Sequence, residues 1–182
     1  RPDSVDNDKL DLIGDISKDY YTWIEYGLQT IHNKTLEKVN RGETFETFLK
    51  SYEATKKRGI NVCVHVILGL WETHEEMMQT AQKLAELGID GVKIHMLCAL
   101  ENTKLAQMYA NKEVDFMSED EYINTVCDFL EYLPQNTTIH RLAGNGLKKE
   151  LIAPRWIGKK LDCLNKIDKE LLRRNSYQGS KF

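Results

Sequence analysis

The sequence predicts an α/β protein, in which parallel strands with flanking helices form a partial TIM-type (βα) barrel, about half of the full barrel. Three observations predict this fold class. Strand-like segments alternate with amphipathic helical segments along most of the chain. The clearest strand, residues 61–69, has an unbroken apolar side, as a strand covered by helices requires. The chain also holds only about half of the eight strand–helix units that a complete barrel needs.

Each expected strand has a local sequence signal. The first is rich in aromatic and β-branched side chains. The second is defined by Val62, Val64, Val66 and Leu68, which line one side of it. The expected strands are, in chain order, residues 20–29, 61–69, 90–98 and 137–142.

The expected helices are marked by apolar spacing and by their ends. Two of them begin with a capping box, formed by Thr73 with Glu76 and by Ser118 with Glu121. Gly88 is suited to the left-handed residue that ends the first of these two helices. The expected helices are, in chain order, residues 1–18, 34–40, 44–58, 73–87, 103–111, 118–133 and 158–173.

We expect two parts along the chain. Residues 1–156 are predicted to be the C-terminal βα units of the barrel, and residues 157–182 a closing helix with a polar tail. The last eight residues of that tail are expected to be loose, because they are mostly polar. The chain begins with Arg1 rather than Met, which favours a fragment of a longer protein.

Composition excludes several classes of protein. The formal net charge is -3, so the chain has no general attraction to nucleic acid. No apolar run is long enough to span a bilayer and no secretory signal is present, which predicts a cytoplasmic location without membrane contact. The four cysteines include no C-x-x-C pair, so we expect buried, reduced thiols rather than a zinc ribbon or a redox motif.

Polar side chains are expected to gather on one side of the parallel strands. In such structures ligands bind at the carboxyl ends of the strands, and side chains alternate between the two faces of a strand. Buried polar groups are costly unless they are hydrogen-bonded or bind a ligand. The polar residues predicted to face the barrel interior are Glu25, Gln29, His65, Lys93, His95 and His140.

Two chemistries fit this set of residues. One is a divalent metal site built from the imidazoles of His65, His95 and His140, although their spacing matches no local metal motif. The other is a site for a polar small molecule with hydroxyl groups and a zwitterionic end. Carboxylate, amide and imidazole groups suit ribose hydroxyls and an ammonium group, and Arg41 suits a carboxylate.

Several segments, in this order, resemble radical S-adenosylmethionine (radical SAM) proteins, and in particular their YhcC-like subgroup. Residues 65–72 resemble the G-x-I-x-G-x-x-E element of the superfamily's fifth strand, with His65 in place of the first Gly. The resemblance covers essentially the whole chain. The segments that carry it are RPD at 1–3, WIEYGLQTIH at 23–32, NRG at 40–42, HVILGLWET at 65–73, GVKIH at 91–95, IHRL at 139–142 and APRW at 153–156.

The resemblance implies an enzyme that binds S-adenosylmethionine (SAM) and a 4Fe-4S cluster. Such enzymes cleave SAM reductively to a 5'-deoxyadenosyl radical, which abstracts hydrogen from a substrate. Gln29 and His65 would then meet the SAM ribose and Arg41 its carboxylate. Ile67 and Gly69 would pass close to the adenine. The other implied site residues are Glu25, facing SAM or the substrate, and His95 and His140 as catalytic candidates on the substrate side.

One part of the family pattern is absent from this sequence. No C-x-x-x-C-x-x-C motif occurs, so the cluster ligands are expected outside this chain, on a missing N-terminal half of the same protein. We therefore expect this chain alone to be inactive. The substrate cannot be named from the residues, and RNA is one possibility. A His-rich divalent-metal hydrolase barrel and a non-catalytic binding module are the alternative functions.

Overall fold

A parallel sheet of four strands organises the molecule. The computed structural model describes residues 1–144 and 149–182. The sheet order is β1-β2-β3-β5, and every neighbouring pair is parallel. This confirms the predicted α/β class and its parallel strands. The strands are β1 (Trp23–Gln29), β2 (Asn61–Leu68), β3 (Gly91–Met96) and β5 (Thr138–Arg141).

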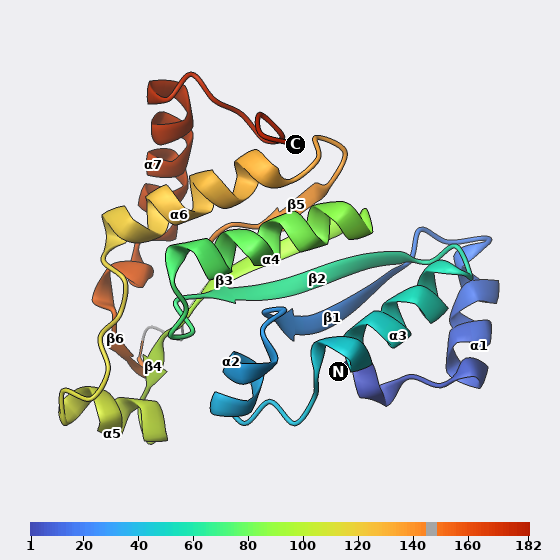
Figure 1. The fold of residues 1–182 in the computed structure, drawn as a ribbon, viewed down its shortest axis with the longest axis horizontal. Helices are drawn as coiled ribbons and strands as arrows, with labels where there is room; N and C mark the ends of the chain where they lie inside the picture. The colour runs from blue at the N-terminus through green and yellow to red at the C-terminus, as the bar shows by residue number, and fades with distance from the viewer. Residues whose placement is uncertain (145–148) are drawn as a thin grey trace.

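Helices connect these strands in the expected alternation (Figure 1). Both capping boxes form, at Thr73 with Glu76 and at Ser118 with Glu121. Gly88 ends its helix with φ at 65°, a left-handed conformation that glycine adopts without strain. The helices are α1 (Asn7–Ser17), α2 (Asn33–Lys38), α3 (Phe45–Lys56), α4 (His74–Leu87), α5 (Lys104–Ala110), α6 (Glu119–Tyr132) and α7 (Lys160–Arg173), with short 3-10 helices η1 (Pro2–Ser4) and η2 (Arg155–Gly158).

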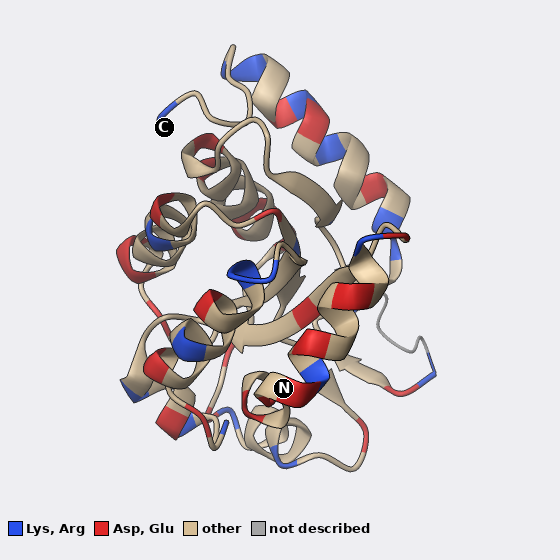
Figure 2. Ribbon diagram, turned by 90° about the vertical axis from the view of Figure 1, so that its right-hand side faces the viewer, with Lys and Arg blue, Asp and Glu red and all other residues tan. Residues whose placement is uncertain are grey.

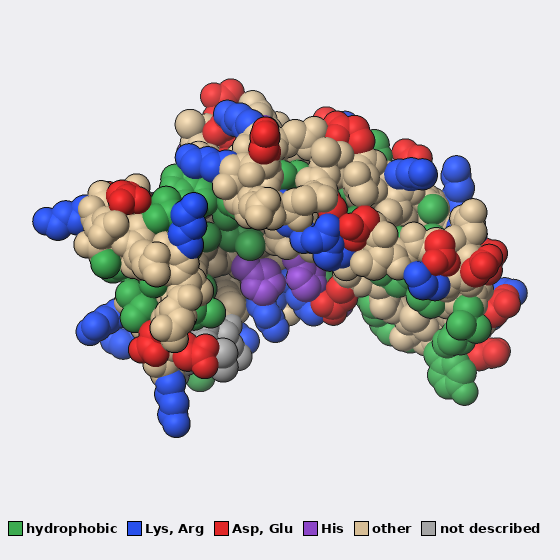
Figure 3. Space-filling view, turned by 90° about the horizontal axis from the view of Figure 1, so that it is seen from below, with side chains coloured by type: hydrophobic (Ala, Val, Ile, Leu, Met, Phe, Trp, Pro, Cys, Tyr) green, Lys and Arg blue, Asp and Glu red, His purple; other side chains and the backbone are tan. Residues whose placement is uncertain are grey.

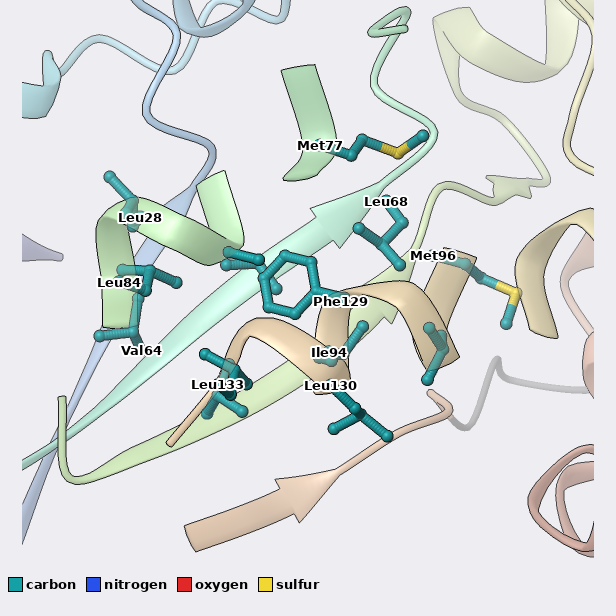
Figure 4. Packing of buried hydrophobic residues seen from close by; sticks show 14 of the residues in the cluster. Leu28, Val64, Leu68, Met77, Leu84, Ile94, Met96, Phe129, Leu130 and Leu133 are labelled. Carbon is teal, nitrogen blue, oxygen red and sulfur yellow. The ribbon is translucent and has the colours of Figure 1, made fainter. Parts of the chain in front are cut away.

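The hydrophobic core lies between one face of the sheet and helices α3, α4 and α6 (Figures 1 and 4). Val62, Val64 and Ile94 of the sheet are fully buried, as are Leu84 of α4 and Phe129 of α6. Each such side chain contributes about 1.5–3 kcal/mol by leaving water. Burial of one strand face therefore fixes which side chains point to the opposite face.

The opposite face of the sheet is open in the described part of the chain. Most of its side chains are at least partly exposed, although Cys63 is buried, and the molecule is hollowed there, with histidines at the centre (Figure 3). We call this surface the open face. Acidic and basic residues are interspersed along the helices seen in Figure 2. None of the described helices combines the length and apolar character needed to cross a membrane.

Two features differ from the expected elements. Strands β4 (Ala99–Leu100) and β6 (Leu151–Ala153) form a small antiparallel sheet, which is too short to give a sequence period. The C-terminal tail is held in place rather than loose. The backbone amides of Gly179 and Lys181 donate to Leu130 and Glu131 of α6, at 3.1 and 2.8 Å. The tail was expected to be loose because its polar residues gave no sign of these contacts with α6.

The C-terminal helix α7 packs against α6. Cys163 and Ile167 of α7 are buried in the common core, and the sulfur of Cys127 donates to the backbone carbonyl of Ile167 at 3.7 Å. All four cysteines are free thiols. Burial raises the pKa of Cys63 to about 12 and that of Cys127 to about 11. Reduced, mostly buried thiols are therefore what the structure contains.

Candidate functional site

A cleft of about 640 Å³ lies at the carboxyl ends of β1 and β2. This volume is typical of small-molecule sites, which span roughly 300–1,000 Å³. Its lining combines polar and apolar side chains. The lining residues are Gln29, Lys38, Val39, Asn40, Arg41, Ile67, Leu70, Trp71, Leu97, Lys104, Leu105 and Met108. Three of the residues predicted to bind the cofactor, Gln29, Arg41 and Ile67, therefore share one cleft.

Gln29 and Arg41 meet over the backbone of Gly27. The guanidinium of Arg41 donates to the carbonyl oxygen of Gly27, from Nη2 at 2.7 Å and from Nε at 3.3 Å. A Cβ atom on residue 27 would lie 2.7 Å from Nε2 of Gln29 and 3.2 Å from Nη2 of Arg41. Gly27 is thus needed so that both side chains can fold back over the end of the strand.

An irregular pairing aims Gln29 into the cleft. The register of β1 on β2 shifts between Gly27 and Gln29, and Gln29 has φ at 78°. This left-handed conformation is uncommon for a residue with a side chain and costs free energy. Asn40 and Trp71, which also line the cleft, have positive φ as well, at 53° and 54°. Backbone strain of this kind often occurs at functional sites.

A network of ion pairs with Glu43, Arg1 and Asp3 holds Arg41 in position. Its Nη2 lies 3.5 Å from the carboxylate of Glu43, which is nearly buried and also pairs with Nε of Arg1 at 2.7 Å. Arg1 in turn binds Asp3 at 2.8 Å. Burial raises the pKa of Glu43 and the Asp3 side chain raises it further. The segment 1–3, quoted for the resemblance, thus helps to position Arg41.

Glu72 joins the two loops that form the cleft. The hydroxyl of Thr30, after β1, donates to the carboxyl of Glu72, after β2, at 2.6 Å. Burial raises the pKa of Glu72. Glu72 is also the acidic residue of the fifth-strand element. Its hydrogen bond with Thr30 makes it a positioning residue, because it ties together the two loops that form the cleft.

Glu25 is the centre of a second polar cluster, on the open face. Nζ of Lys93 donates to both carboxylate oxygens of Glu25, and Nε2 of His65 donates to Oε2 at 2.8 Å. These bonds, above all the one from Lys93, lower the pKa of Glu25. Burial is the main cause that lowers the pKa of His65. The predicted convergence of side chains from β1, β2 and β3 is thus present.

His95 lies beside this cluster. Its ring centre is 5.5 Å from that of His65. Burial, together with the nearby His65 and Arg141, lowers the pKa of His95 to about 4, so the imidazole is neutral at pH 7. Its Nε2 is buried and has no hydrogen-bond partner among the residues described. A buried polar atom without a partner is unusual and points to a missing ligand or water.

His140 and Gly69 lie elsewhere. His140 packs edge-on against Trp23, with ring centres 4.5 Å apart, at the amino-terminal end of the strands. In the described residues no three side chains are arranged to hold a metal, so His65, His95 and His140 do not form one site. A Cβ atom on Gly69 would lie 3.3 Å from the sulfur of Met117, outside the cleft lining.

Arg141 is a candidate residue that the sequence did not single out. The pairing of β3 with β5 shifts after Val92, and Lys93 then lies beside Arg141. This irregularity turns Arg141 to the open face, where it helps to lower the pKa of His65 and His95. Strict alternation along the strand gives no signal for such a shift.

The geometry can be compared with known proteins. Residues 2–84 match the model of the radical SAM superfamily, and residues 89–173 match the model of the radical SAM C-terminal domain. The chain belongs to the radical SAM superfamily. The chain is similar to the uncharacterized protein YtqA of Bacillus subtilis, at 38% identity, and to the protein YhcC of Escherichia coli, at 31% identity. An uncharacterized protein of Methanocaldococcus jannaschii is 40% identical.

The radical SAM relatives are longer than this chain. The alignments cover 99–100% of the chain but 57–59% of these three relatives. A solved structure, Elp3 of Methanocaldococcus infernus with residues 1–46 deleted, superimposes with a TM-score of 0.76. That match covers 91% of this chain and 39% of Elp3, at 20% identity, and so supports the fold alone.

Proposed function

We propose that this chain is the cofactor-binding C-terminal portion of a radical SAM enzyme. The observation that carries the proposal is the cleft at the carboxyl ends of β1 and β2. Gln29, Arg41 and Ile67 come from three separate segments, and all three line it. Ligands of parallel α/β folds bind at this end of the strands.

The residues of the cleft fit SAM. Ile67, Leu97 and Leu70 offer an apolar surface that suits an adenine ring. The amide of Gln29 can donate to and accept from ribose hydroxyls, and the guanidinium of Arg41 can bind a carboxylate. With SAM and a 4Fe-4S cluster bound, the enzyme would generate a 5'-deoxyadenosyl radical by reductive cleavage. The cluster ligands would be supplied by a part of the protein outside this chain.

This chain's own residues would bind and orient the cofactor. Glu43 and the carbonyl of Gly27 hold the guanidinium of Arg41 near one position, so little side-chain entropy is lost when a carboxylate arrives. Trp71, at the rim, lies under Nζ of Lys38 at 4.9 Å from the ring centre. An aromatic ring and a lysine stem at the rim would limit access of water to the bound nucleoside.

The open face would lie toward the substrate. Glu25, His65 and His95 are within one polar cluster there, and we assign them to substrate binding or proton transfer. With its pKa lowered to about 4, His95 is a neutral imidazole at pH 7, which can donate one hydrogen bond and accept another. His140, beside Trp23, is a weaker catalytic candidate because it lies at the other end of the strands. A cytoplasmic location and an RNA substrate stay predictions.

The test uses the full-length protein with its cluster reconstituted. We expect formation of 5'-deoxyadenosine from SAM under reducing conditions, and none from this chain alone. Gln29→Ala should raise the KM for SAM by about tenfold, from the loss of side-chain hydrogen bonds. Gln82→Ala, at an exposed position on α4, is the matched control and should change nothing. A full-length protein with an intact cluster that forms no 5'-deoxyadenosine would refute the proposal.

A further inference from the structure

The open face has an excess of positive charge where β3 and β5 lie side by side. Lys93 and Arg141 are register partners on neighbouring parallel strands, so their side chains leave the same face of the sheet. Glu25 is the carboxylate bound there, and its two oxygens already accept from Lys93 and His65. This part of the open face thus carries two cationic side chains, Lys93 and Arg141, and one carboxylate, Glu25.

Arg141 has no ion pair in residues 1–144 and 149–182. Arg155 has none either, but its side chain is exposed. The other five arginines each bind at least one carboxylate: Arg1, Arg41, Arg58, Arg173 and Arg174. The side chain of Arg141 is only partly exposed, and the register shift of β5 places it opposite Lys93. It is near enough to His65 and His95 for its charge to help lower the pKa of both. A guanidinium in this position is suited to bind an oxyanion with two parallel hydrogen bonds.

His95 supplies an independent sign of a missing ligand. Its Nε2 is buried without a described partner. On the other side of the ring, Gly144 is close: a Cβ atom there would lie 3.6 Å from Nδ1. Leaving a polar atom buried and unpaired costs about 1–3 kcal/mol. A ligand oxygen that reached Nε2 would remove this cost.

We infer that the open face binds a singly charged oxyanion of the substrate, a carboxylate or a phosphodiester, between the guanidinium of Arg141 and Nε2 of His95. One negative charge balances the excess of one cation in the group formed by Glu25, Lys93 and Arg141. The inference rests on the proposed function, since it assigns this surface to the substrate. The substrate of the enzyme would then be a molecule that carries a carboxylate or a phosphodiester.

The test is an NMR titration of this chain with small anions, followed through the ring protons of His95. The probes are acetate for a carboxylate, dimethyl phosphate for a phosphodiester, and acetamide as the uncharged analogue. We expect a saturable shift of the His95 signals with at least one of the two anions and none with acetamide. The anion that binds more tightly identifies the source of the charge.

Two variants of equal charge change complete the test. Arg141→Gln should weaken anion binding by about tenfold or more. Arg173→Gln removes an equally charged but exposed arginine on α7 and should leave the affinity unchanged. Should Arg141→Gln not fold, Arg141→Lys is the alternative. Lysine keeps the positive charge but cannot make two parallel hydrogen bonds to one oxyanion, so anion affinity should fall by an intermediate amount. The absence of a saturable shift with either anion, or an equal loss in both glutamine variants, would overturn the inference.

Binding of methylthioadenosine separates this inference from the proposed function. The nucleoside should bind in the cleft beside Gln29, and Arg141→Gln should leave its affinity unchanged. If the anion binds and the nucleoside does not, the cofactor proposal fails while the anion site stands. If the nucleoside binds and neither anion does, the anion site is refuted while the cofactor proposal stands.

Discussion

Gly27→Ala is the substitution that most clearly separates binding from folding. A Cβ atom on residue 27 would lie 2.7 Å from Nε2 of Gln29 and 3.2 Å from Nη2 of Arg41, and both are far ends of flexible side chains. The backbone of Gly27 is not in the positive-φ region. We therefore expect the protein to fold while both side chains leave their positions in the cleft.

The effect on stability should be small, because two contributions oppose each other. Replacing glycine by alanine within a strand stabilises the fold by about 0.5–1 kcal/mol, through the entropy of the unfolded chain. The displaced Arg41 loses its hydrogen bonds to the carbonyl of residue 27, which costs about 0.5–1.5 kcal/mol. The net change should stay within about 1 kcal/mol, or about 2–4 °C in Tm.

The effect on binding should be larger. Both Gln29 and Arg41 would lose the positions that fit ribose and carboxylate groups, and each misplaced polar contact costs about 1 kcal/mol. Affinity for SAM should then fall by about tenfold or more. Calorimetric titration with SAM and a thermal melt measure the two effects. Gly158→Ala is the matched control, because an added Cβ there meets nothing within 4 Å.

One result would refute this reasoning: Gly27→Ala that binds SAM as tightly as the parent protein. The cleft beside Gln29 and Arg41 would then not be the cofactor site. A variant that unfolds would instead contradict the claim that the added methyl group meets only flexible side-chain ends.

Three further predictions concern the fold and the open face. Gly69→Ala should destabilise the protein by about 1–2 kcal/mol, measured by denaturant unfolding. Gly69 has φ at 87°, and the sulfur of Met117 would lie 3.3 Å from the added Cβ. A loss of stability no greater than that of Gly158→Ala would contradict this prediction. His95 should titrate near pH 4 by NMR. Its folded pKa lies below the unfolded value of 6.5, so the shift contributes about 1–2 kcal/mol to the free energy of unfolding, a figure reduced for partial exposure. This contribution is complete above pH 6.5 and is lost as the pH falls toward 4. His95→Gln should remove this pH dependence of stability, and a titration of His95 near pH 6.5 would show that the ring is not buried. β1 lies at the edge of the sheet, so light scattering should detect dimers or larger species at high concentration, and a compact monomer would count against the half-barrel arrangement.

The fold could be predicted in large part because its signals are periodic. The four parallel strands and the capped helices follow from alternation, apolar spacing and the boxes at Thr73 and Ser118. The small sheet of β4 and β6 could not be predicted, because strands of two or three residues are too short to show an alternation of apolar and polar side chains. The anchored C-terminal tail depends on backbone contacts with α6, which leave no trace in the side-chain pattern.

The candidate site could be predicted only where strands are regular. Glu25, His65 and Lys93 meet because each follows strict alternation on its strand. Register shifts at Gln29 and Arg141 break this rule, so strict alternation along the strand does not predict Arg141 on the open face. The assignment of Gln29, Arg41 and Ile67 to one cleft came from the resemblance, and the loop after α2 brings Arg41 to it.

The most direct test of the account is a structure of this protein determined with SAM bound. The account predicts the adenine against Ile67 and Leu97 and the ribose within hydrogen-bonding distance of Gln29. It also predicts the carboxylate of the ligand on the guanidinium of Arg41. Ligand density away from this cleft, or Gln29 and Arg41 both turned from the ligand, would contradict it.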